Sequence, residues 1–448
     1  MQFIPQILFI IVSAVAIFLF ARKAKEIRRN ILLGRDETIN DHPGRRWRNV
    51  LLLAFGQKKM FRNPTVAILH FFVYAGFIII NIEVLEIILD GILGTHRLFA
   101  SSLGSLYNLL INSFEVLALL VILGCAIFLI RRNILKLKRF ASKDLDGWPR
   151  SDANYILITE IVLMLLFLNF NASDTLLQAR GVTHYAVNPT GNFIISQSLH
   201  PLLNSFENNS LELIERSCWW LHIVGIYAFL NYLPWSKHLH ILLAFPNAYY
   251  ARLAPIGEMT NMKEVQNEVL YAMRPELTPT QVTEPNGATN MMAPGKFGAK
   301  DIMDLSWKNL LDAYSCTECG RCSAACPATI TGKRLSPRKI MMDTRDRMEE
   351  VSRSINKNGG NGAENGRTLL HNYITPEELR ACTTCNACVQ ECPVSISPLD
   401  IILQLRRYLV MEESNAPQEW NAMFSNTENN FAPWKFSPDE RDAWNTKM

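Results

Sequence analysis

The sequence predicts a mainly α-helical protein, in which a bundle of five transmembrane helices is followed by a smaller, cysteine-rich helical domain. Two observations predict this class. Almost half of the 448 residues are hydrophobic, and long apolar runs fill the first 250 residues. Eight of the ten cysteines fall in two short runs near the C-terminus. Regular cysteine runs in a chain of this size indicate metal ligation and not a disulfide framework.

The apolar segments are long enough to cross a bilayer, which requires about 20 mostly apolar residues per helix. Five segments meet this requirement: Phe3 to Phe20, Thr65 to Leu89, Leu106 to Ile130, Tyr155 to Asn171, and Trp219 to Ala244. The first has no positive charge before its apolar run, and basic residues follow it. We therefore expect an uncleaved anchor and not a secretory signal.

The basic residues predict the orientation of these helices. Lysine and arginine gather after the first and third segments, whereas residues 172–217 contain no lysine and only Arg180 and Arg216. The positive-inside rule then places the N-terminus outside and everything after the fifth helix in the cytoplasm. We expect a multi-pass protein of a bacterial or archaeal cytoplasmic membrane. The net charge of +4 is too small to indicate nucleic-acid binding.

Composition divides the chain into four parts. Residues 1–250 form the expected membrane domain, and residues 251–305, rich in Pro, Met, Asn, Gly and Thr, have the composition of a linker. Residues 306–412 hold the cysteine runs, with a loop expected from Asn356 to Gly366, and residues 413–448 form a C-terminal docking extension.

The two cysteine runs share one spacing, Cys-x2-Cys-x2-Cys-x3-Cys-Pro. They are Cys316, Cys319, Cys322 and Cys326 before Pro327, and Cys382, Cys385, Cys388 and Cys392 before Pro393. This spacing is typical of proteins with two 4Fe–4S clusters, in which the fourth cysteine of each run ligates the other cluster. The prediction is therefore crossed: Cys316, Cys319, Cys322 and Cys392 hold cluster one, and Cys382, Cys385, Cys388 and Cys326 hold cluster two.

Zinc is the alternative metal. A structural zinc site needs four ligands in Cys-x2-Cys pairs, so the third cysteine and the Cys-Pro ending of each run would be surplus. We favour iron–sulfur clusters. The two remaining cysteines, Cys125 and Cys218, lie alone in apolar segments and are expected to be core residues.

Histidines in the apolar segments are candidate haem ligands. On one continuous helix, the 18 residues between His222 and His240 make five turns, so both lie on one face about 27 Å apart. His70 lies at the depth of His240, and we expect these two to share one haem iron. His238 points elsewhere and is interpreted as structural.

A second, outer haem needs a partner for His222. Ile80 occupies the position ten residues beyond His70. His96, His184 and His200 stay open as candidates for the second ligand.

Four carboxylates fall within the apolar segments: Glu83, Glu86, Glu115 and Glu160. Such groups can serve proton transfer from a quinol, but we favour paired structural roles.

Two stretches resemble known families. His222-x11-Pro234-Trp235-Ser236-Lys237-x2-His240 resembles the last helix of the cytochrome b (gamma) subunit of respiratory nitrate reductase, and the membrane subunit of heterodisulfide reductase. The resemblance implies that His222 and His240 ligate haem b. In nitrate reductase two histidines ten residues apart complete both haems. Here Met60 and Ile80 stand ten residues either side of His70, so one or two haems are expected.

Residues 314–338 are similar to the ferredoxin-like half of the heterodisulfide reductase catalytic subunit and of glycerol-3-phosphate dehydrogenase iron–sulfur subunits. The segment from Asn429 to Trp444 matches the point where those relatives pass into a Cys-Cys-Gly domain, which this sequence lacks. The resemblance implies a separate Cys-Cys-Gly subunit as partner, and an electron-transferring flavoprotein as another.

The expected function is that of an oxidoreductase component in a respiratory chain. It would pass electrons between menaquinone or ubiquinone and a cytoplasmic partner, through haem b and two clusters, with no catalytic residue in this chain. Two alternatives are a self-sufficient ferredoxin–quinone oxidoreductase and a non-enzymatic iron–sulfur redox sensor or scaffold.

Overall fold

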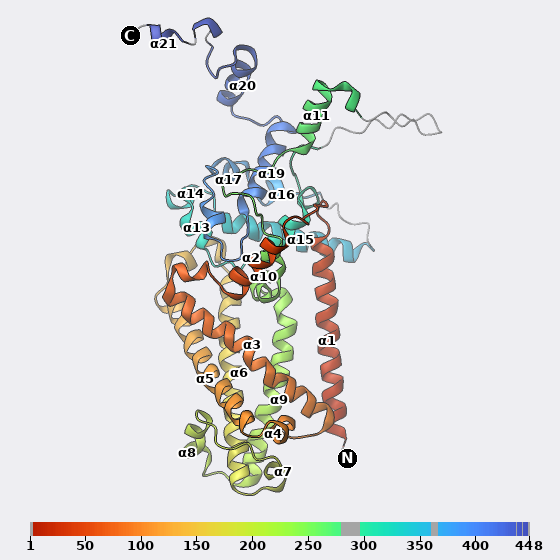
Figure 1. Cartoon of the computed structure of the whole chain (residues 1–448), viewed down its shortest axis with the longest axis vertical. Helices are drawn as coiled ribbons and strands as arrows, with labels where there is room; N and C mark the ends of the chain where they lie inside the picture. The colour runs from red at the N-terminus through yellow and green to blue at the C-terminus, as the bar shows by residue number, and fades with distance from the viewer. Residues whose placement is uncertain (1–2, 279–295, 360–365, 436, 441, 447–448) are drawn as a thin grey trace, which may run out of the picture.

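The computed structural model describes residues 3–278, 296–359, 366–435, 437–440 and 442–446. These residues form helices and turns, and across them the only β-type pairings are two isolated bridges. A long helical bundle carries the cysteine domain at one end, and the N-terminus lies at the other (Figure 1). The predicted mainly α-helical class is confirmed.

The bundle consists of α1 (Ile4–Ile31), α3 (Pro64–Leu93), α5 (Ser105–Leu129), α6 (Trp148–Ala179) and α9 (Asn208–Tyr232). Short helices lie at its ends: α2 (Pro43–Asn49), α4 (Leu98–Leu103), α7 (Thr183–Ala186), α8 (His200–Leu203) and α10 (His240–Tyr249). Helix α6 packs along α9 and α5, and α3 packs along α5. The core between them is aliphatic and aromatic, with Phe9, Phe167 and Ile223 fully buried.

Within the described residues, four helical segments are long and apolar enough to cross a membrane: Ile4–Ile31, Pro64–Leu93, Ser105–Ile134 and Trp148–Ala179. The predicted fifth helix from Trp219 to Ala244 is wrong as one continuous element. Helix α9 ends at Tyr232, two 3₁₀ turns follow, and α10 begins at His240. Pro234 explains the break, because proline has no N–H for a helical hydrogen bond.

Asp152 on α6 stabilises this break. Its carboxylate accepts hydrogen bonds from the hydroxyls of Tyr232 and Ser236, the latter at 2.7 Å, and from the backbone N–H of Lys237 at 3.2 Å. One buried carboxylate thereby satisfies groups that a continuous helix would have paired differently.

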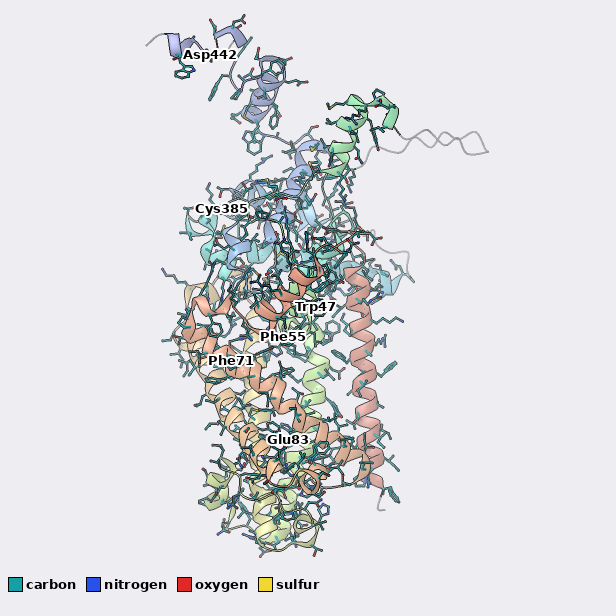
Figure 2. All side chains as sticks on the ribbon, in the orientation of Figure 1. Trp47, Phe55, Phe71, Glu83, Cys385 and Asp442 are labelled. Atoms are coloured by element: carbon teal, nitrogen blue, oxygen red, sulfur yellow. The ribbon has the colours of Figure 1, made fainter. Side chains whose placement is uncertain are left out.

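Carboxylates in the half of the bundle far from the cysteine domain are paired. Glu83 marks this region, well away from Cys385 (Figure 2). The pairs are Arg97 with Glu83 at 3.4 Å, Tyr107 with Glu86 at 2.7 Å, and Asn171 with Glu115 at 3.1 Å. These contacts support the structural interpretation for the three glutamates.

The cysteine domain contains α12 (Trp307–Tyr314), α13 (Arg321–Ala325), α14 (Pro327–Ile330), α15 (Pro337–Lys357), α16 (Leu369–Asn372), α17 (Pro376–Arg380), α18 (Ala387–Glu391) and α19 (Pro398–Met411). Its core continues into the bundle, because Ile27 and Ile31 at the end of α1 belong to it. The backbone of Arg35 is also hydrogen-bonded to that of Leu305 at 2.7 Å. The two domains therefore share one packed interior.

The segment expected to be a linker has structure where it is described. Helix α11 (Lys263–Met273) lies within it, and Ala299, Ile302 and Leu305 are fully buried in the core of the cysteine domain. Its central part, residues 279–295, and most of the loop expected from Asn356 to Gly366 lie outside the described residues. The extension after α19 carries α20 (Gln418–Asn430) and α21 (Ala443–Thr446).

Arg338 on α15 joins the cysteine domain to the loop between α5 and α6. Its Nη2 lies 2.6 Å from Oδ1 of Asp144, and the two side chains are 1% and 11% exposed. Burial works to raise the pKa of Asp144, but hydrogen bonds from Arg338 and Ser142 outweigh it and hold this pKa below its usual value. Such a carboxyl stabilises the fold above its unfolded pKa, and the stabilisation is lost as pH falls through the folded pKa.

We expect Arg338→Gln to lower the free energy of unfolding by about 3 to 5 kcal/mol, because Asp144 is left buried without its partner. Denaturant unfolding of the purified protein at neutral pH measures this. The loss should shrink in acid, where Asp144 is protonated in both states. Arg334→Gln is the control, since its ion pair with Glu377 is two-thirds exposed, and it should change nothing measurable. Equal effects of the two variants would contradict the role of Arg338.

Candidate functional site: cysteine pockets and a histidine group

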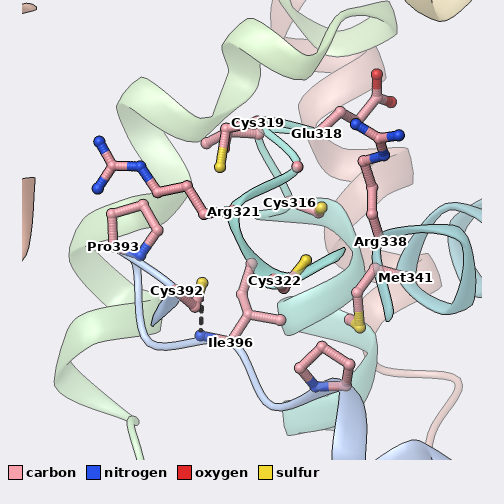
Figure 3. A pocket seen from close by; sticks show the side chains of 13 residues that line it. Cys316, Glu318, Cys319, Arg321, Cys322, Arg338, Met341, Cys392, Pro393 and Ile396 are labelled. Atoms are coloured by element: carbon pink, nitrogen blue, oxygen red, sulfur yellow. Dashed lines mark hydrogen bonds between the residues drawn. The ribbon is translucent and has the colours of Figure 1, made fainter. Parts of the chain in front are cut away.

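Four thiols from both cysteine runs line one pocket. Cys316 and Cys319 come from the loop between α12 and α13, Cys322 comes from α13 itself, and Cys392 comes from the end of α18. Figure 3 shows their sulfur atoms around a common space. The Sγ of Cys392 also accepts a hydrogen bond from the backbone N–H of Ile396 at 3.3 Å. One thiol of the second run thus lies beside three thiols of the first, which is the grouping that the crossed assignment requires.

The other four cysteines form a second group. Cys382, Cys385 and Cys326 are the electrostatic neighbours of Cys388, whose pKa is raised to about 12, first by burial and then by these thiols. Cys385 is exposed, at the edge of the domain away from the bundle (Figure 2).

The two cysteine loops have the same backbone. Glu318 and Gly320 in the first run have φ of 52° and 71°, and Thr384 and Asn386 at the matching positions of the second have φ of 56° and 61°. Such left-handed residues let a short loop bring its groups to one centre. The repeated spacing therefore folds into a repeated structure.

The chemistry of the first pocket fits a 4Fe–4S cluster. Burial raises the pKa of Cys316 and of Cys392 to about 12, so both thiols hold their protons until a metal supplies positive charge. Apolar side chains such as Met341 and Ile396 complete the wall. Among the described residues no three cysteine, histidine or acidic side chains converge as closely as a single ion requires. The four thiols instead surround a wider space.

Hydrogen bonds join the first pocket directly to the helical bundle. Lys237, in the break after α9, donates from Nζ to Glu318 in the cysteine loop at 2.5 Å. Its backbone carbonyl lies 3.0 Å from Nδ1 of His240. Lys59 donates to the backbone carbonyl of Cys392 at 3.1 Å. A histidine of the bundle is therefore joined to the cysteine loop through a single residue.

Three histidines gather at this end of the bundle. His70 is an electrostatic neighbour of His238 and His240, and the rings of the latter two lie 5.5 Å apart. Nδ1 of His70 lies 3.0 Å from Oε1 of Gln57, and Nδ1 of His240 bonds to the carbonyl of Lys237. A proton on Nδ1 leaves the Nε2 lone pair free for a metal, which is how haem-ligating histidines are held. The half-buried imidazoles of His70 and His240 thus each present an Nε2 of the kind that can ligate a haem iron.

His238 belongs to the same group, although the sequence interpretation put it on another face. Its ring packs on Phe77 and Phe229, and its buried Nε2 has no hydrogen-bond partner within the described ranges. The break in the helix is the reason: with α9 and α10 no longer one helix, the 18-residue spacing of His222 and His240 loses its geometric meaning.

His222 lies apart, deeper in the bundle. Its Nδ1 is 2.9 Å from the backbone carbonyl of Leu163, and its ring lines a pocket together with Ile80 and Glu160.

The three outer candidates for its haem partner do not line that pocket. His96 bonds to Asp174 at 3.1 Å, His200 lies 3.0 Å from the hydroxyl of Thr175, and the ring of His184 packs 5.3 Å from that of His96.

Three residues that orient the histidines or bind the cysteine loop were not predicted as site residues from the sequence: Lys237, Gln57 and Lys59. Lys237 stands in the Pro-Trp-Ser-Lys stretch that resembles nitrate reductase, and that stretch was the available signal. Nothing in the sequence distinguishes Gln57 or Lys59 from the other polar residues between the first two apolar segments.

Comparisons with known proteins support the assignment of the cysteines to clusters. Residues 315–396 match the family model described as a 4Fe-4S dicluster domain. The chain is 27% identical, over 98% of its length, to 60% of the probable iron-sulfur-binding oxidoreductase FadF of Bacillus subtilis (strain 168). It is 25% identical, over 90% of its length, to 54% of the EtfAB:quinone oxidoreductase of Syntrophomonas wolfei.

A shorter match of 32% identity links 34% of the chain to 24% of a probable membrane-anchored ferredoxin of Chromohalobacter salexigens. No solved structure matches the chain. The chain spans between half and two thirds of the length of the first two relatives. It carries a two-cluster 4Fe–4S domain on an apolar helical bundle, and its similarities are to iron–sulfur electron-transfer proteins.

Proposed function

We propose that the protein is a membrane-bound electron-transfer subunit that passes electrons between the quinone pool and a cytoplasmic redox partner. The observation that carries this proposal is the double contact of Lys237, which holds Nδ1 of His240 by its carbonyl and Glu318 of the cysteine loop by its Nζ. A histidine group and a thiol pocket in such proximity suit direct electron exchange. The similarity to a relative named as an EtfAB:quinone oxidoreductase supports quinone as the membrane electron carrier.

The chain's residues would hold three redox groups. His70 and His240 would ligate a haem b, Cys316, Cys319, Cys322 and Cys392 would hold cluster one, and Cys382, Cys385, Cys388 and Cys326 would hold cluster two. These cofactors carry one electron at a time, while the protein supplies their position and surroundings. Their order follows from burial, because the first pocket faces the bundle and Cys385 lies at the exposed edge of the domain.

The proposal also includes a redox partner for the chain and an orientation of the chain in the membrane. Similarity to a component of a CoB-CoM heterodisulfide reductase of Methanosarcina acetivorans favours a separate redox subunit, and the EtfAB name favours an electron-transferring flavoprotein. Residues 413–448 are the proposed docking extension, since their exposed apolar side chains include Trp420, Phe431 and Trp434. The N-terminus would lie outside and the clusters in the cytoplasm of a bacterial or archaeal cell.

An anaerobic titration tests the proposal. Reduced naphthoquinol added to the full chain in lipid nanodiscs should reduce the haem and bleach the broad visible absorbance of the clusters. Lys237→Met is the informative variant, because it removes the contact with Glu318 but keeps the carbonyl that holds His240. Haem reduction should persist in this variant and cluster reduction should slow at least tenfold. If neither chromophore responds to quinol in the unaltered chain, the proposed function fails.

The same preparation separates the alternatives. Sustained quinone reduction by the single chain with reduced ferredoxin would establish the self-sufficient enzyme. Clusters that change with oxidant but never with quinol, in a chain without haem, would establish the sensor.

A further inference from the structure

A pocket at the middle of the bundle places two polar groups in a largely apolar wall. Helices α3, α5, α6 and α9 contribute to it, and most of its lining is aliphatic or aromatic, with Phe77 and Phe229 among the aromatic residues. Glu160 of α6 and His222 of α9 supply the polar groups, beside Asn81, whose amide is already bonded to the carbonyl of Phe77. A small number of polar groups in an apolar cavity is typical of small-molecule sites.

Glu160 is the unusual member of this lining. It is 7% exposed, and within the described ranges no hydrogen bond or ion pair of its carboxyl is present. The other buried acids of the bundle are paired, as Glu83, Glu86 and Glu115 show. A carboxyl buried without a partner is unfavourable unless a ligand pairs with it, so an intramembrane acid of this kind indicates a functional site.

His222 offers the second polar contact. With its Nδ1 donating to the carbonyl of Leu163, its Nε2 is left as an acceptor for a group in the pocket. No other histidine is among the residues that line the pocket, and Ile80 is part of its apolar wall. The lining therefore favours a ligand with two polar ends over a second haem.

We propose that this pocket binds the ring of a hydroquinone or quinone, with one ring oxygen at Glu160 and the other at Nε2 of His222. The aromatic residues of the wall stack on such a ring. This inference rests on the proposed function and assigns a binding site to the quinone of that function. Oxidation of the bound hydroquinone breaks two O–H bonds and releases two protons and two electrons. Glu160 takes one proton and His222 the other, and the electrons leave singly to the one-electron carriers of the chain.

Binding of a fluorescent hydroquinone analogue, 2-heptyl-4-hydroxyquinoline N-oxide, to the full chain in nanodiscs tests the site. Quenching of its fluorescence should give saturable binding to the unaltered chain. Glu160→Gln should weaken the affinity at least fivefold, with haem and iron content unchanged. Ile226→Phe, which fills the pocket from α9 without touching either polar group, should abolish binding. Glu207→Gln, the same change at an exposed position, should leave the affinity as it was.

The outcomes separate this inference from the proposed function. If the unaltered chain binds the analogue and both pocket variants bind equally well, the pocket is not the site although quinone exchange stands. If the unaltered chain neither binds the analogue nor reacts with quinol, the proposed function itself fails. Two haems per chain, with one lost in His222→Ala, would show that a haem fills the pocket and would overturn the inference.

Discussion

Replacing Cys392 by serine is expected to destroy the cluster held by the first cysteine run, although Cys392 belongs to the second. The reason is that its Sγ lines the pocket of Cys316, Cys319 and Cys322. Non-haem iron should fall from about eight to about four per chain, with an equal loss of inorganic sulfide. The electron paramagnetic resonance spectrum of the reduced Cys392→Ser protein should match that of Cys316→Ser, because the same cluster remains in both.

The reciprocal pair provides the control. Cys326→Ser should give the spectrum of Cys385→Ser, since those two thiols belong to the second group. Cys125→Ser and Cys218→Ser, outside both groups, should keep about eight non-haem irons. If Cys392→Ser resembles Cys382→Ser instead, each run closes on its own cluster and the crossed arrangement is wrong.

The cysteine pockets could be predicted because their geometry is local. A two-residue gap between thiols and a loop with left-handed residues determine where three of the four sulfur atoms lie, and the repeat of the run supplies the fourth. The match of residues 315–396 to the dicluster domain agrees with that prediction.

The histidine geometry could not be predicted in the same way. The 18-residue spacing places His222 and His240 on one face only if a single helix runs from Trp219 to Ala244, and hydrophobicity alone predicts that helix. Pro234 was visible as a helix breaker, but the carboxylate of Asp152 that stabilises the break comes from a helix some eighty residues earlier. Periodicity carries no information about such a contact.

The contacts between the two domains could not be predicted from the sequence either. Lys237 bonds to Glu318, and Arg338 to Asp144, across long stretches of sequence. The prediction treated the cysteine domain as tethered by a linker, whereas Ile27 of α1 and Ile302 of that supposed linker share its core. Charged residues in a basic loop are most often interpreted as signals of membrane topology. Their hydrogen bonds to another domain therefore leave no distinct pattern in the sequence.

Removing His70 or His240 is expected to abolish the proposed haem b, because each variant would leave the iron with one imidazole in an apolar environment. The haem-to-protein ratio and the Soret absorbance of His70→Ala and His240→Ala should both fall to background. Iron and sulfide in the clusters should stay near the unaltered values, which shows that the variants are folded.

His238→Ala is the decisive control, since His238 lies in the same group with an unpartnered Nε2 among the described residues. It should retain haem, because the ligands that remain are already oriented: Nδ1 of His240 is fixed by the carbonyl of Lys237, and Nδ1 of His70 by Gln57. Gln57→Leu should keep haem but shift its reduction potential, since the imidazole of His70 loses the acceptor that raises its basicity. If His238→Ala loses the haem while His240→Ala keeps it, the ligand pair is His70 and His238, and the break in the helix has exchanged the roles of two neighbouring histidines.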